Sequence, residues 1–90
     1  MSYELIFSPI AEEDWKNLPE ELRADFTIRL NELAEHPTRN SRPSLCPPYW
    51  PNHQMREFSI ESNGRMWYCV ILFKYMDNET ELWIAALGSR

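Results

Sequence analysis

The side chains best suited to chemistry in this 90-residue chain are one histidine and a scattered set of cations. His53 is the main acid–base candidate, because imidazole changes its charge near neutral pH. Arg56 and Arg65 are the nearest cations that could assist it, as catalytic or phosphate-binding groups. Further candidates for anion binding are Arg39, Arg42, Lys74 and Arg90. These residue types indicate proton transfer or anion binding, and the alternative for each is an ordinary solvated surface side chain.

Other kinds of site find little support in the sequence. Cys46 and Cys69 form no Cys-x-x-Cys motif, and neither has a histidine at zinc-ligand spacing. We therefore expect two reduced thiols, with Cys69 an inert small hydrophobe rather than a reactive thiol. Gly64 and Gly88 are the only glycines, which excludes a glycine-rich phosphate loop. The sequence predicts no metal site and no cofactor.

Charge is spread unevenly along the chain, whose net charge is −5. Residues 1–36 hold nine acidic and three basic residues, whereas residues 37–90 hold five acidic and six basic ones. The first part should repel phosphate backbones, so we expect weak nucleic-acid binding at most. The chain shows no apolar run of about 20 residues and no signal-peptide pattern, which predicts a cytoplasmic protein with no membrane contact.

The elements that must position these residues begin with a strand over residues 3–8 and two helices. Ser8 and Pro9 predict the start of the first helix, since serine caps helices and proline suits the first helical position. Ile10, Trp15 and Leu18 supply its apolar stripe, and Pro19 separates it from the second helix. Apolar residues of the second helix recur at spacings of four, four and three, as Leu22, Phe26, Leu30 and Leu33.

The rest of the chain reads as a proline-rich loop followed by strands. Five prolines interrupt residues 37–54, which predicts a loop there, with Tyr49 and Trp50 either packed on the core or exposed. Residues 55–60, 66–75 and 82–87 are β-prone and separated by turn signals. We expect one α+β domain over residues 1–90, with about four mainly antiparallel strands and both helices on one face. The run 66–75 should be central and covered on both faces, with Leu5, Phe7, Val70 and Leu72 packed against the helices.

Four segments in order carry a resemblance to a known family: YELIFS (3–8), DWKNLP (14–19), LAEHP (33–37) and IAALGSR (84–90). They resemble the opening strand, the first helix with its Leu-Pro junction, the end of the second helix and the last strand of the RelE/ParE superfamily of small bacterial toxins. The resemblance implies a toxin of a type II toxin–antitoxin system, with an antitoxin as partner and a protein target or the ribosome as its site of action.

The chain departs from this family where cleaving members hold arginine. Members that cut messenger RNA on the ribosome show Glu-apolar-Arg on the second strand and Tyr-Arg-apolar on the third. The matching segments here are 57–59, which ends in Ser59, and 68–70, where Cys69 or Val70 takes the arginine position. Family lysines before the second strand are also missing, and a late tyrosine of some members would fall beyond Arg90. The resemblance therefore implies poor cleavage.

Three functions remain open at this point. The first is a toxin that binds its target, for which gyrase is the example that the resemblance supplies. The second is a non-toxic, toxin-derived interaction module. The third is a residual ribosome-dependent endoribonuclease that uses the candidate residues Arg39, Arg42, His53, Arg56 and Arg65 in place of the usual set. The acidic composition counts against the third, because a ribosome-directed nuclease needs a basic face.

Overall fold

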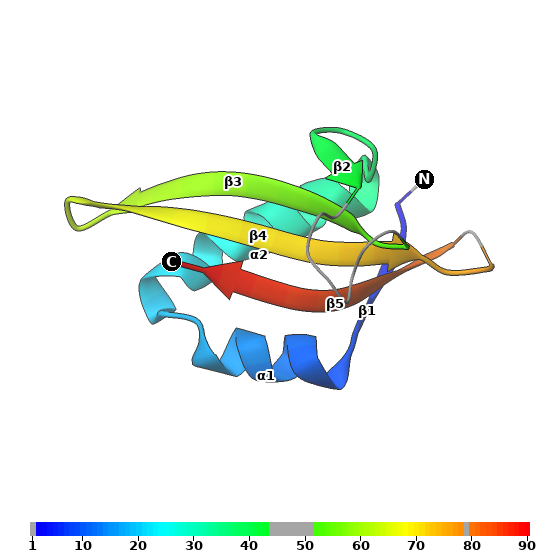
Figure 1. Ribbon diagram of the computed structural model, residues 1–90, viewed down its shortest axis with the longest axis horizontal. Helices are drawn as coiled ribbons and strands as arrows, with labels where there is room; N and C mark the ends of the chain where they lie inside the picture. The colour runs from blue at the N-terminus through cyan, green and yellow to red at the C-terminus, as the bar shows by residue number, and fades with distance from the viewer. Residues whose placement is uncertain (1, 44–51, 79) are drawn as a thin grey trace.

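A computed structural model describes residues 2–43, 52–78 and 80–90 of the chain. The elements are β1 (Glu4–Phe7), α1 (Pro9–Asn17), α2 (Glu20–Glu35), β2 (Ser41–Pro43), β3 (Gln54–Ser62), β4 (Arg65–Tyr75) and β5 (Glu81–Ser89). Figure 1 shows a twisted sheet with its long strands side by side and the two helices behind and below it. None of the described helices is long and apolar enough to cross a membrane.

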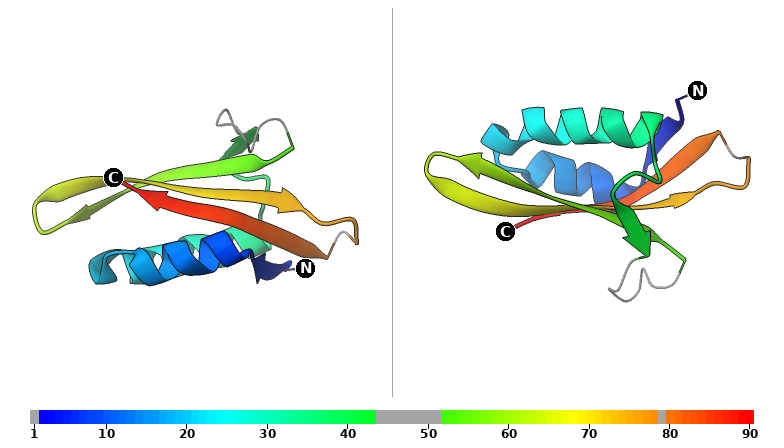
Figure 2. Two further views of the ribbon diagram at one scale, coloured as in Figure 1. Left: turned by 60° about the horizontal axis from the view of Figure 1, so that its bottom comes forward. Right: turned by 90° about the horizontal axis from the view of Figure 1, so that it is seen from above.

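The sheet has five strands in the order β1-β5-β4-β3-β2. β1 runs parallel to β5, whereas β5, β4, β3 and β2 pair antiparallel in succession. Both helices lie on one face of this sheet, and no helix of the described residues lies on the other, which is called the helix-free face below (Figure 2). The expected α+β architecture, with a leading strand, a helical hairpin and a three-strand meander, is confirmed.

The helices begin where the sequence indicates. Ser8 caps α1: its hydroxyl accepts a hydrogen bond from the Ala11 amide at 3.0 Å and donates one to the Ala85 carbonyl at 2.8 Å. This buried serine therefore ties the start of α1 to β5. α2 begins directly after Pro19. The Pro19 carbonyl accepts a hydrogen bond from the Leu22 amide at 2.9 Å, within the first turn of the helix.

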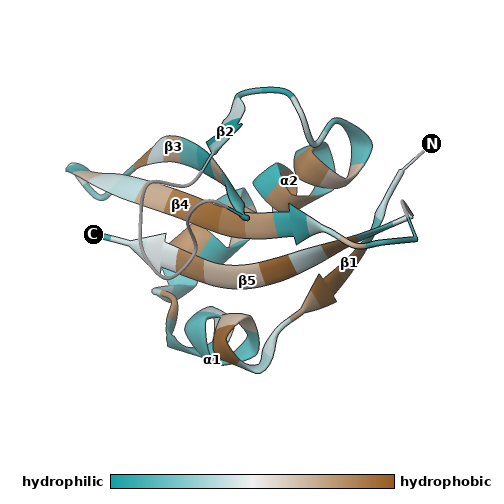
Figure 3. Ribbon diagram, turned by 45° about the vertical axis from the view of Figure 1, so that its right-hand side comes forward, coloured by the Kyte–Doolittle hydropathy of each residue, from teal (hydrophilic) through white to brown (hydrophobic). Residues whose placement is uncertain are grey.

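The main core lies between the helices and the sheet. The predicted stripe of α2 is buried in full, as Leu22, Phe26, Leu30 and Leu33. Phe26 meets Phe58 of β3 edge to face, with 5.0 Å between the ring centroids. Leu5 and Phe7 of β1 pack against this core while staying partly exposed. Figure 3 shows the hydrophobic colour concentrated in β1 and the middle of β4 and β5.

Two expectations about which residues face the core are wrong. Val70 and Leu72 point away from the helices, and the β4 residues that pack against them are Cys69, Ile71 and Phe73. The sequence could not give this phase, because the run 66–75 is apolar on both sides of the strand and strict alternation is absent. On α1 the buried position is Ala11, and Ile10 is exposed.

The expectation that the central strand is covered on both faces is met only in part: on the helix-free face Leu72 is buried in a second cluster with Met55, Ala85 and Ala86. Met66 and Tyr68 on the helix-free face are 51% and 63% exposed. One reason is that β5 pairs with β4 only from Cys69 onward, so the end of the β3–β4 hairpin extends past the end of β5 (Figure 1). Glu21 of α2 holds the hairpin tip from the helical side by accepting hydrogen bonds from Ser62 and Asn63, at 2.7 and 2.6 Å.

The proline-rich segment also needs a correction. Ser41–Pro43 form the short edge strand β2 inside the expected loop 37–54, and β3 already begins at Gln54. Pro43 is tolerated because an edge strand has one side free of ladder hydrogen bonds. The expectations for Cys46, Tyr49 and Trp50 fall outside the described residues.

Candidate functional site

The helix-free face of the sheet carries a groove of about 550 Å³. Its floor is apolar, because Met55 of β3 lies opposite Leu72 of β4, and Val70 lines the groove two residues before Leu72 on the same strand. The rim is polar, and its residues come from four strands, β2, β3, β4 and β5. The lining residues are Arg42, Met55, Glu57, Tyr68, Cys69, Val70, Leu72, Gly88, Ser89 and Arg90.

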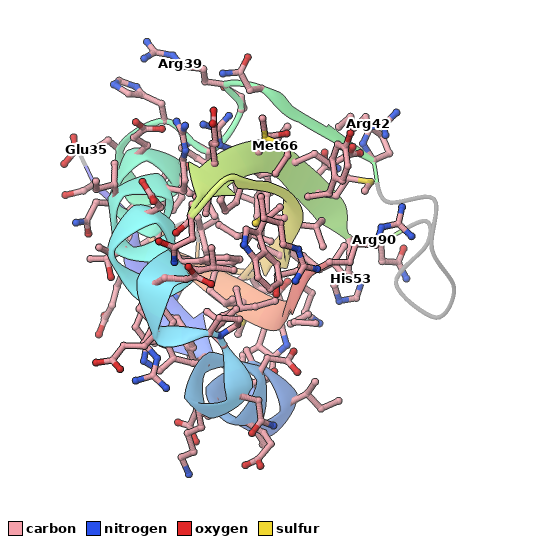
Figure 4. The ribbon with its side chains drawn as sticks, turned by 90° about the vertical axis from the view of Figure 1, so that its left-hand side faces the viewer. Glu35, Arg39, Arg42, His53, Met66 and Arg90 are labelled. Atoms are coloured by element: carbon pink, nitrogen blue, oxygen red, sulfur yellow. The ribbon has the colours of Figure 1, made fainter. Side chains whose placement is uncertain are left out.

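Strand pairing brings two of the sequence candidates into this groove. Arg42 arrives because β2 pairs with β3 and places it opposite Met55. Arg90 arrives because its backbone exchanges hydrogen bonds with Tyr68, at 2.8 and 2.9 Å. Figure 4 shows Arg42 and Arg90 on the side of the sheet away from the helices. The two arginines are 48 positions apart in sequence, so only the fold joins them.

Glu57 changes the electrostatics of the groove. Its Oε1 atom accepts hydrogen bonds from Nε of Arg42, at 3.0 Å, and from Nη2 of the same side chain. Both side chains are about half exposed, so this is a solvent-screened ion pair that an incoming anion can open. While Arg42 is paired with Glu57, Arg90 is the other cation of the rim, and the ion pairs of the described residues do not include it. Sequence reasoning did not single out Glu57, although its alternation with Ser59 would have placed both on one face.

Arg56 and Arg39 do not reach the groove. Arg56 faces the helices, is 5% exposed, and donates from Nη2 to Glu32 Oε2 of α2 at 3.0 Å. Its Nη1 also donates to the Arg39 carbonyl at 3.4 Å. Arg56 therefore fastens β3 to the end of α2 and to the turn before β2. Its surroundings fit a structural ion pair, on the opposite side of the sheet from Arg42.

The remaining candidates lie at other places in the fold. Arg65 stacks on the Trp67 ring at the hairpin end, with 3.7 Å from its guanidinium carbon to the ring centroid. Lys74 is half-buried near the far end of β4, opposite Trp83. His53 directly precedes β3, whose first residue pairs with Phe73 of β4. Arg90 pairs instead with Tyr68, which lies five residues before Phe73 on the same strand. At a rise of ~3.4 Å per residue this separates His53 from Arg90 by roughly 17 Å or more along the sheet.

Register decides what occupies the two positions where the resemblance leads one to expect arginine. Ser59 lies opposite Tyr68 and is exposed. Of the two alternatives on β4, Val70 faces the groove, and Cys69 packs among the core residues on the helical side. Burial raises the pKa of the Cys69 thiol, and the Asp25 carboxylate raises that pKa further. Serine, valine and a protonated thiol offer no positive charge to a phosphate.

Known structures with the same arrangement are toxins of the RelE type. The toxin–antitoxin complex RelBE2 from Mycobacterium tuberculosis matches with a TM-score of 0.73 and 19% identity, over 100% of both chains. The intact RelBE complex of E. coli matches with a TM-score of 0.66 and 19% identity, over 97% of this chain and 95% of the other. This chain has the RelE fold. The RelE fold is thus shared at full length, although the sequences have diverged widely.

A third match is a substituted form of the E. coli toxin. Free E. coli RelE carrying two arginine-to-alanine substitutions matches with a TM-score of 0.65 and 19% identity, over 98% of this chain and 83% of the other. No protein-family model matches this sequence, and a search of curated proteins also gives no match. The RelE fold is accordingly established by structure alone, and the groove chemistry has to be argued from the residues present.

Proposed function

We propose that this RelE-fold protein is the toxin of a type II toxin–antitoxin pair, and that it acts by binding a target rather than by efficient cleavage of messenger RNA. The observation that carries the second part is the composition of the helix-free groove. Ser59 and either Cys69 or Val70 stand where the resemblance leads one to expect arginine, and Arg42 is engaged by Glu57.

The physical reason lies in the charge of the transition state. Attack by a ribose 2′-hydroxyl on phosphorus needs a base, an acid and cations that neutralise a dianionic phosphorane. The groove offers Arg90, an Arg42 that is already paired with Glu57, and the Tyr68 hydroxyl. Loss of even one stabilising group commonly lowers the rate about 100-fold or more. The same groove, with an apolar floor and a polar rim, suits a protein segment better than a scissile phosphate.

An antitoxin is the expected regulatory partner. The matching M. tuberculosis and E. coli structures are complexes of a toxin with its antitoxin. By analogy we propose that an antitoxin masks this chain until it is degraded or displaced. A non-toxic interaction module is the alternative within the same fold, because the same surfaces would serve a partner without any toxic effect.

The test combines growth and cleavage. We expect induced expression in a bacterial host to arrest growth, while primer extension across a defined messenger in a translation assay shows no cuts at the ribosomal A site. The matched variant is the double substitution Ser59→Arg and Val70→Arg, which places two guanidinium groups on the groove. Cuts that appear only in this variant would show that these two positions limit cleavage.

Three other outcomes are informative. Codon-positioned cuts by the unmodified protein that vanish on Arg42→Ala or Arg90→Ala would overturn the binding proposal and favour a residual endoribonuclease. Cuts that vanish on Arg56→Ala or Arg65→Ala would also overturn the binding proposal, and they would place the catalytic residues outside the groove. Absence of both growth arrest and cuts would favour the non-toxic module.

A further inference from the structure

The last strand, β5, carries one residue more than the stretch of β4 that lies opposite it. Phe73 pairs with Ile84, whereas Leu72, the preceding residue of β4, pairs with Ala86. Ala85 is therefore the extra residue of a β-bulge, and both Ala85 and Ala86 pack with Leu72 on the helix-free face. Side chains of a strand alternate between its two faces, so one inserted residue exchanges the faces of all the residues that follow.

The bulge decides which face of the sheet Arg90 occupies. Ile84 packs in the main core on the helical side, and Arg90 follows it by six residues. An unbroken strand would therefore turn Arg90 toward the helices and place Ser89 opposite Tyr68. With the bulge, Arg90 exchanges backbone hydrogen bonds with Tyr68 and lines the helix-free groove.

Two polar side chains at α1 fasten β5 at the bulge and just beyond it. The strand β1 ends before the bulge, and the following stretch of β5 runs beside α1 (Figure 1). Ser8, the N-cap of α1, donates a hydrogen bond from Oγ to the Ala85 carbonyl at 2.8 Å. Asp14 Oδ2 accepts a hydrogen bond from the Leu87 amide at 3.0 Å. On this edge of β5, α1 thus supplies hydrogen-bond partners of the kind that a neighbouring strand supplies elsewhere.

Asp14 holds the part of β5 that leads from the bulge to Arg90. Arg90 directs its backbone amide and carbonyl toward β4, so Leu87, three residues earlier, directs its amide to the opposite edge, where Asp14 accepts it. A carboxylate accepts such a bond more strongly than a neutral oxygen does. Asp14 is half-buried, and the ion pairs of the described residues do not include it. The bond to the backbone of β5 is therefore not weakened by a competing cation from those ion pairs.

We infer that Asp14 is a positioning residue for the helix-free groove: its bond to Leu87 holds β5 in the bulged register, and this register aims Arg90 into the groove. A strand that lost the bulge would bring Ser89, a neutral side chain, to the place of Arg90. The groove would then lose the cation that is not paired with Glu57. The inference rests on the proposed function for the use of Arg90, whereas the register can be measured without any target.

The experiment compares the full chain with three variants by nuclear magnetic resonance. Asp14→Ala removes the acceptor, and we expect hydrogen exchange at the Leu87 amide to become about tenfold faster or more. Asp14→Asn removes the charge but keeps an acceptor oxygen, so this exchange rate should stay within about threefold of that of the unmodified protein. Glu13→Ala, at an exposed position of α1, is the control and should leave the rate unchanged.

The register itself is read from backbone contacts between β4 and β5 in the same spectra. In Asp14→Ala the contact between Tyr68 and Arg90 should weaken, and a contact between Tyr68 and Ser89 should appear. Asp14→Asn should restore the original contact, which a loss of stability alone would not explain. If Asp14→Ala does not fold, Asp14→Ser takes its place, because the serine hydroxyl is one bond shorter and does not reach the amide. An unchanged contact between Tyr68 and Arg90 in the variant without the acceptor, or equal effects of Asp14→Asn and Asp14→Ala, would overturn the inference.

Growth arrest on induction separates this inference from the proposed function. Arg90→Ala and Asp14→Ala should both weaken the arrest, whereas Asp14→Asn and Glu13→Ala should retain it. If Asp14→Ala changes the register while Arg90→Ala still arrests growth fully, the positioning role of Asp14 stands, and the role of Arg90 in target binding fails.

Discussion

At the scale of single residues, the arginines of this chain divide into structural and accessible groups. Arg56 is buried with its guanidinium fastened to Glu32, whereas Arg42 lies in the open groove and is held by a half-exposed Glu57. The first kind of pair maintains the fold, because a buried charge without its partner is costly. The second kind can exchange its carboxylate for another anion at little cost.

Glu32→Gln should measure the worth of the carboxylate that Arg56 and Arg29 share. The substitution removes the carboxylate that Arg56 needs, and water can partly replace it because Glu32 itself is about half exposed. We expect a loss of about 1–2 kcal/mol in the free energy of unfolding, measured by urea titration. Glu35→Gln, at an exposed site of the same helix, is the control and should change stability by less than about 0.5 kcal/mol. Equal stability of both variants would mean that the Arg56 ion pair contributes nothing.

Cys69 should react slowly in the native state. Its pKa is raised by burial and, to a smaller degree, by Asp25, so less thiolate is present at pH 8 than for a free cysteine. In a Cys46→Ser background, Ellman's reagent should modify Cys69 much faster in urea than in buffer. Because the folded state holds this proton more tightly than the unfolded state, the contribution to stability is complete below the thiol's ordinary pKa of 9.0. This contribution is lost as the pH rises further. In the reactivity experiment, equal rates of modification in urea and in buffer would contradict the burial of Cys69.

At the scale of elements, α2 contributes most to the packing between the helices and the sheet. Phe26 is fully buried at the middle of the stripe and meets the Phe58 ring. Phe26→Ala should therefore lower the free energy of unfolding by about 3–5 kcal/mol, which threatens a domain of this size. The milder Phe26→Leu keeps the protein measurable if alanine unfolds it.

Ile28→Ala on the same helix is the control for this substitution. Ile28 is 54% exposed, so its truncation should cost less than about 0.5 kcal/mol while the change in helix propensity stays small. Chemical denaturation curves of the three variants provide the comparison. Similar losses for Phe26→Ala and Ile28→Ala would mean that the helix is rotated relative to the arrangement described.

At the scale of the whole molecule, charge and layers coincide. The two helices, which carry eight acidic and three basic residues, lie on one face of the sheet (Figure 2), whereas Arg42 and Arg90 lie on the other face (Figure 4). A large basic surface of the kind that binds ribosomal RNA does not arise from the residues that line the groove.

Binding to structured RNA or duplex DNA should accordingly be weak. The groove offers Arg90 and an Arg42 that is paired with Glu57. For structured RNA or duplex DNA we therefore expect a Kd on the order of 10 µM or weaker at physiological salt. The slope of log K against log salt should be shallow, no steeper than about −2, because at most two phosphates are neutralised. Glu57→Gln releases Arg42 and should strengthen binding by a few-fold. Submicromolar binding with a steep slope would reveal a basic face that the groove does not show.

The amino-acid sequence by itself determined the order of the elements other than β2, the helix boundaries and the buried stripe of α2. Each of these follows from local signals: Ser8 and Pro9 at a helix start, Pro19 between helices, and leucines and phenylalanine at helical spacing. Only the tertiary structure decided the phase of β4, because a run that is apolar on both sides carries no alternation. It also decided that Arg42 and Arg90 share a groove and that Arg56 does not. Such contacts depend on strand register between distant segments. The short segment Ser41–Pro43 forms strand β2 by pairing with β3, which lies later in the sequence.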